Sequence, residues 1–79
     1  MKLELYYQPG CGYCRSVLNT IKNLKIEAKV HLKNVQESTV YERELVTELG
    51  DTQVPTLFVD GIPMRESEDI KKFLFQTFA

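Results

Sequence analysis

The chain has 79 residues, of which 10 are basic and 11 acidic, and its formal net charge is −1. This length allows one small domain, and the charge balance lacks the basic excess of a nucleic-acid-binding surface. No apolar run approaches the roughly 20 residues that span a membrane, and residues 1–8 do not resemble a signal peptide. The sequence predicts a single domain over 1–79, in the cytoplasm, that binds neither membranes nor nucleic acids.

The first half of the chain has the pattern of a strand, a helix and a strand. Apolar and polar side chains alternate over 2–7, and apolar side chains recur at helical spacing over 11–25. Alternation returns over 29–35 and places Leu32 on one face and Lys33 on the other. A strand–helix–strand run predicts two parallel strands joined by a right-handed crossover.

A second helix is predicted in the stretch ESTVYERELVTELG. Ser38 or Thr39 is a candidate N-cap because a side-chain oxygen there accepts a hydrogen bond from the first turn. Gly50 follows the last apolar residue and is expected to end the helix.

The last third of the chain predicts a hairpin and a third helix. Asp60-Gly61 separates two short apolar runs, which is a strong hairpin signal, and Pro63 confines the second strand to a sheet edge. Ser67 is expected to cap a final helix. The predicted order is strand, helix, strand, helix, strand, strand, helix, which is an α/β fold.

The two cysteines of the chain, Cys11 and Cys14, are two residues apart at the predicted start of the first helix. Free amides and the helix dipole favour a negative charge there, and the pKa of a thiol is lowered, above all in a Cys-x-x-Cys arrangement. We expect Cys11 to be the attacking thiolate and the more sheltered Cys14 to be the resolving thiol.

Two other interpretations of the pair are weaker. Zinc needs four ligands, and His31 is the one other typical ligand in the chain, so the sequence predicts no metal site. A structural disulfide would close a very small loop and constrain the unfolded chain little. The redox interpretation is therefore favoured.

Three segments together resemble the glutaredoxins: Cys-Gly-Tyr-Cys at 11–14, QVPTLFVDG at 53–61 and ESEDI at 66–70. The resemblance implies a thioredoxin-like fold, a four-stranded mixed sheet with helices on both faces. It implies a thiol–disulfide oxidoreductase that reduces protein disulfides or glutathione mixed disulfides, with glutathione or a similar low-molecular-weight thiol as reductant or co-substrate. We expect a monomer that needs no metal.

The resemblance also implies a groove for the thiol ligand. Val54-Pro55 would be a cis bond that leaves the Val54 backbone free to pair with the cysteinyl part of glutathione. Glu66-Ser67 is similar to the Glu-Ser of glutathione transferase N-terminal domains, which holds the γ-glutamyl end of glutathione. The implied binding residues are Tyr13, Gln53, Val54, Pro55, Glu66 and Ser67.

One segment departs from the family pattern. Many glutaredoxins carry a lysine shortly before the first cysteine, where this chain has Gln8-Pro9-Gly10, so Arg15, Arg43 or Lys33 would have to supply the cation. A dedicated electron donor to ribonucleotide reductase, recharged by thioredoxin reductase (a flavin reductase), is an alternative function. A carrier of a [2Fe–2S] cluster, with Cys11 as a ligand, is another.

Overall fold

The structure is a computed structural model that describes residues 1–79, and it is built on one mixed sheet with the strand order β2-β1-β3-β4. The strands are β1 (Leu3–Tyr7), β2 (Val30–Asn34), β3 (Thr56–Val59) and β4 (Ile62–Met64). β1 and β2 are parallel, and the other neighbours are antiparallel. The predicted α/β thioredoxin-like fold is confirmed.

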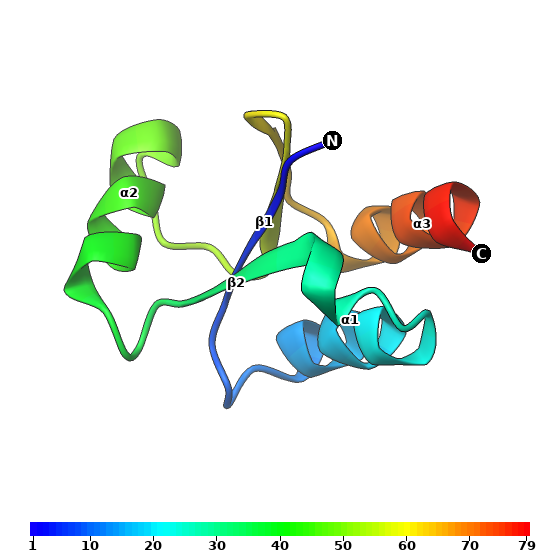
Figure 1. Cartoon of the computed structure of the whole chain (residues 1–79). Helices are drawn as coiled ribbons and strands as arrows, with labels where there is room; N and C mark the ends of the chain where they lie inside the picture. Colours follow the sequence, from blue (N-terminus) through cyan, green and yellow to red (C-terminus); the bar gives the residue numbers. More distant parts are fainter.

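Helices cover both faces of the sheet, as Figure 1 shows. They are α1 (Gly12–Asn23) and α3 (Ser67–Phe78) on one face, and α2 (Thr39–Leu49) on the other. A short 3₁₀ helix, Glu27–Lys29, leads into β2. None of the helices combines the length and the apolarity that a bilayer crossing requires.

The apolar core is divided by the sheet into two unequal parts. The larger part lies between the sheet and the α1–α3 pair and contains nine buried residues, among them Leu5, Val17 and Leu74. The smaller part lies under α2 and contains four, among them Tyr6 and Leu45. Because burial of apolar area drives folding, α1 and α3 are held more firmly to the sheet by apolar contact than α2 is.

The predicted turn residues have the conformations that were expected of them. Ser38 caps α2, and its Oγ accepts a hydrogen bond from the Tyr41 amide. Gly50 ends this helix with a left-handed backbone, φ 80°. Asp60 and Gly61 both have positive φ, as the tight hairpin requires, and β4 with its proline is an edge strand.

The ends of two helices differ from the prediction. α1 does not run over 11–25: Cys11 is its N-cap, and the helix stops at Asn23 because Lys25 adopts a left-handed backbone, φ 57°. Ser67 is not the N-cap of α3 but its first residue. Glu66 takes the cap position with an extended backbone and makes no capping hydrogen bond with its side chain.

The alternation in β2 does not correspond to inside and outside. Lys33 is buried, with 6% of its surface exposed, whereas Leu32 is 37% exposed. The reason is tertiary, since β2 is a sheet edge and the face that carries Lys33 is covered by α2.

Candidate active site

Cys11 stands where the chain leaves the turn after β1 and enters α1. Its backbone is extended (φ −90°, ψ 123°), so its side chain caps the helix and its Sγ accepts a hydrogen bond from the Cys14 amide at 3.2 Å. Its Sγ also lies 4.0 Å from the carbonyl oxygen of Val54. A sulfur that receives helix N-terminal amides is well placed to carry a negative charge.

The pKa values of the two thiols are shifted in opposite directions. Burial raises the pKa of Cys11, but hydrogen bonds from the Cys14 thiol and from the Cys14 and Tyr13 amides outweigh burial, so the net pKa is lowered. Burial raises the pKa of the Cys14 thiol, which is fully inaccessible to solvent, to about 12. One accessible sulfur is thus prepared as a thiolate, next to one sheltered thiol.

A groove of about 440 Å³ lies between the loop before β3 and the start of α3. Cys11 is not one of its lining residues but adjoins it, because the carbonyl of the lining residue Val54 is 4.0 Å from Cys11 Sγ. The structure brings together around the groove all six residues to which the resemblance assigns a binding role: Tyr13, Gln53, Val54, Pro55, Glu66 and Ser67. Arg65 and Glu68 complete the lining. The Val54–Pro55 bond is cis, as the resemblance implied, and the Val54 amide has no hydrogen-bond partner in the chain.

Sequence reasoning missed the basic residue of this groove, Arg65. The Arg65 side chain lines the groove, although the resemblance to the glutaredoxins did not imply it. The signal that could have found it is its position immediately before Glu66, at the point where the chain turns from β4 into α3.

Comparison with known proteins identifies the family. Residues 3–62, the segment from β1 into β4, match the Glutaredoxin family. The chain belongs to the glutaredoxin family. It has a thioredoxin-like fold and carries the Cys11–Cys14 pair. A curated thioredoxin from Griffithsia pacifica is 33% identical over 58 residues, which are 71% of this chain and 53% of that protein. The chain therefore spans about half the length of that relative.

Solved structures with the same fold include glutathione transferases and a thioredoxin-like protein. A glutathione transferase from Bombyx mori superposes with a TM-score of 0.77 at 23% identity, over 100% of this chain and 37% of that one. A delta-class glutathione transferase from Nilaparvata lugens gives 0.74 at 28% identity, over 98% and 36%. A thioredoxin-like protein gives 0.75 at 23% identity, over 92% and 100%.

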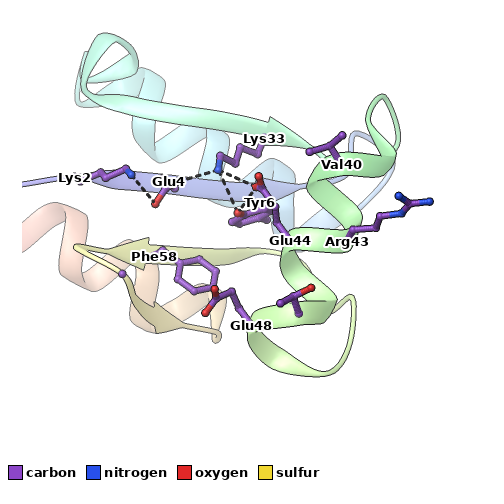
Figure 2. A pocket seen from close by; sticks show the side chains of 11 residues that line it. Lys2, Glu4, Tyr6, Lys33, Val40, Arg43, Glu44, Glu48 and Phe58 are labelled. Atoms are coloured by element: carbon purple, nitrogen blue, oxygen red, sulfur yellow. Dashed lines mark hydrogen bonds and ion pairs between the residues drawn. The ribbon is translucent and has the colours of Figure 1, made fainter.

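Two cations that could have replaced the lysine of other glutaredoxins lie elsewhere. Lys33 and Arg43 line a separate cavity of about 680 Å³ between α2 and the sheet, shown in Figure 2. Lys33 Nζ bonds there to Glu4 Oε2 (2.8 Å), Glu44 Oε1 (3.0 Å) and the Tyr6 hydroxyl (3.2 Å). This cavity shares no lining residue with the groove whose Val54 carbonyl lies 4.0 Å from Cys11 Sγ, so it is a separate site.

The opposed pKa shifts predict selective alkylation of the reduced protein. The fraction of thiolate rises as the pH rises through the pKa, so the lowered pKa of Cys11 moves the midpoint of its reaction with iodoacetamide to lower pH than that of an ordinary thiol. Cys14, with a pKa of about 12, stays protonated and unlabelled near neutral pH. Mass spectrometry of samples quenched across a pH series measures both sites, and labelling of Cys14 before Cys11 would contradict the assignment.

Proposed function

We propose that this glutaredoxin-family chain is a thiol–disulfide oxidoreductase that reduces protein disulfides or glutathione mixed disulfides through Cys11 and Cys14. The state of the two thiols supports the proposal most. The Cys11 sulfur accepts a hydrogen bond from the Cys14 amide and its pKa is lowered, while the Cys14 thiol is buried and its raised pKa keeps it protonated. Reduction of a disulfide by a dithiol needs one thiolate to attack the substrate and a second thiol to resolve the mixed disulfide that forms.

The reaction consists of two exchanges. The Cys11 thiolate attacks one sulfur of the substrate disulfide, an S–S bond forms to Cys11, and the other substrate sulfur leaves as a thiolate. Cys14 then gives up its proton and attacks the Cys11 sulfur, which breaks the mixed disulfide and releases the second substrate thiolate. Two electrons have passed to the substrate, and the protein holds a Cys11–Cys14 disulfide.

The groove offers the contacts that a glutathionyl group needs. The unpaired Val54 amide could form a backbone hydrogen bond with the cysteinyl residue of glutathione. Glu66 could pair with the γ-glutamyl ammonium, and the Ser67 hydroxyl with the first amides of α3 could receive the α-carboxylate. The exposed ring of Tyr13 would cover the thiol from the side of α1.

A second candidate differs in the reductant. The 33% identity to a thioredoxin favours a dedicated electron donor, such as one that supplies ribonucleotide reductase, recharged by a flavin-dependent thioredoxin reductase. Both candidates use the same dithiol. We place either activity in the cytoplasm, because a close cysteine pair that works in the reduced state suits a reducing compartment.

The proposal predicts a trapped adduct. With Cys14→Ser, oxidised glutathione should leave one glutathionyl group on Cys11, because the resolving thiol is missing. In the unmodified chain the adduct should instead give way to the Cys11–Cys14 disulfide. Intact-mass spectrometry distinguishes these products, and absence of any adduct on Cys14→Ser would overturn the glutathione assignment.

The reductant is identified with the oxidised protein. Recovery of the two thiols with glutathione alone supports the first candidate. Recovery with NADPH and thioredoxin reductase, but not with glutathione, supports the second.

A further inference from the structure

The positive charge of the groove beside Cys11 is already neutralised. Arg65 is the one basic residue in the lining, and its outer nitrogen Nη2 forms an ion pair with Asp51 Oδ1. Its inner nitrogen Nε is buried without a hydrogen-bond partner, so the polar contact of this guanidinium is made with Asp51.

Asp51 and Arg65 are held in place by further contacts that join the two walls of the groove. The Gln53 amide donates to Asp51 Oδ1 at 3.1 Å, and the Gln53 side-chain amide donates to the Arg65 carbonyl at 3.3 Å. Thr56 Oγ1 in turn donates to the Gln53 carbonyl at 2.8 Å. The ion pair therefore belongs to a connected network rather than to two independent surface side chains.

The negative charges of the lining are not balanced in the same way. Glu68 pairs with Lys71 at 2.9 Å, on the side of α3 that faces α1. Glu66 is exposed, and its carboxylate has no ion-pair or hydrogen-bond partner. Since Arg65 is paired and Arg15 is not part of the lining, the uncompensated charge of the groove is the Glu66 carboxylate.

We infer that this groove selects disulfide substrates by charge and favours a thiol component with an ammonium group or a basic flanking residue over one that carries only a carboxylate. The inference rests on the proposed exchange at Cys11 and refines its substrate class. The exchange step is unchanged, because the charge acts on encounter and binding. Asp51 is a positioning residue in this scheme, since it keeps Arg65 from attracting anionic substrates.

The test uses three small symmetrical disulfides that differ in charge: cystamine, bis(2-hydroxyethyl) disulfide and 3,3′-dithiodipropionate. The rate at which each oxidises the reduced protein is divided by its rate with dithiothreitol, which removes the intrinsic reactivity of the disulfide. We expect the corrected rate to be highest for cystamine and lowest for the dicarboxylate. Glu66→Gln should reduce the cystamine-to-dicarboxylate ratio roughly threefold to tenfold, the size of a single partly screened charge interaction.

Two further variants make the test specific. Asp69→Asn removes one charge from the same first turn of α3 but lies outside the groove lining, and it should leave the ratio unchanged. Asp51→Asn should raise the rate with the dicarboxylate, because Arg65 loses its partner. Circular dichroism establishes that each variant is folded.

The possible outcomes separate the inference from the proposed function. An equal ratio in the unmodified chain and Glu66→Gln, or an equal drop in Glu66→Gln and Asp69→Asn, would overturn the charge selection. If the neutral disulfide oxidises the reduced protein no faster than it oxidises dithiothreitol, the result would instead count against the oxidoreductase function itself.

Discussion

Replacement of Cys11 by serine is expected to lower the turnover of disulfide substrates by at least about a thousandfold, because no other group can form the mixed disulfide. Cys14 cannot take over, since it is fully buried and its pKa is about 12. The serine hydroxyl can still cap α1, so the fold should be kept. Turnover of bis(2-hydroxyethyl) disulfide, with glutathione or thioredoxin reductase as the electron source, measures the effect.

Cys14→Ser is the matched control for this prediction. It removes the other sulfur of the pair but leaves the nucleophile, so the first exchange should continue while release of a protein substrate through the intramolecular disulfide is lost. Near-normal turnover by Cys11→Ser, with circular dichroism showing a native fold, would mean that the reaction does not pass through Cys11.

Replacement of Lys33 by methionine is expected to lower the free energy of unfolding by about 2 to 3 kcal/mol near neutral pH, less than for a fully buried ion pair because one of its partners can rehydrate. The side chain of Lys33 is 8% exposed, that of Glu4 is 16% exposed and that of Glu44 is 40% exposed. The Lys33 Nζ also lies 5.0 Å from the centre of the Tyr6 ring. Figure 2 shows the contact between Lys33 and Glu4. Without the lysine, Glu4 keeps a poorly solvated carboxylate that has lost its close partner.

Urea unfolding followed by circular dichroism measures this loss, and Lys2→Met is the matched control. Lys2 also faces Glu4, but at 3.9 Å and with 72% of its side chain exposed, so its replacement should change the free energy of unfolding by at most about 0.5 kcal/mol. Adding Glu4→Gln to Lys33→Met should recover part of the loss. Equal values for the two lysine variants would show that burial of Lys33 contributes nothing specific.

The loss should depend on pH in a defined direction. Hydrogen bonds from Tyr6 and Lys33 hold the pKa of Glu44 below its usual range, so this contribution is present at neutral pH and is lost as the pH falls through that lowered pKa. The pKa of Lys33 is raised, so its own contribution persists until the pH rises far into the alkaline range. The difference between the unmodified chain and Lys33→Met should therefore shrink in acid.

The order of helices and strands, the α/β fold class and the position of the cysteine pair at the start of a helix were all predictable from local sequence. The alternation of β1, the glycine that ends α2 and the Asp60-Gly61 turn act over a few neighbouring residues, and a local signal is enough to read them. The Cys-x-x-Cys spacing likewise places Cys11 at the N-cap and Cys14 in the first turn of one helix. The prediction of helix ends was less accurate. An N-cap is defined by its backbone conformation, and the sequence does not show whether Glu66 or Ser67 adopts it.

Only the tertiary structure decided the charges of the groove and the interior of the α2 face. The β3–β4 hairpin separates Asp51 from Arg65 in the sequence. Lys33 in β2 pairs with Glu4 in the neighbouring strand β1 and with Glu44 in α2. No local sequence pattern contains these pairs. Burial of a charge is tolerable only when the charge is paired. A charged residue is therefore predicted to be exposed as long as its partners are unknown. The sequence by itself therefore determined the redox pair and its scaffold, whereas long-range ion pairing decided which cations remain available to a substrate.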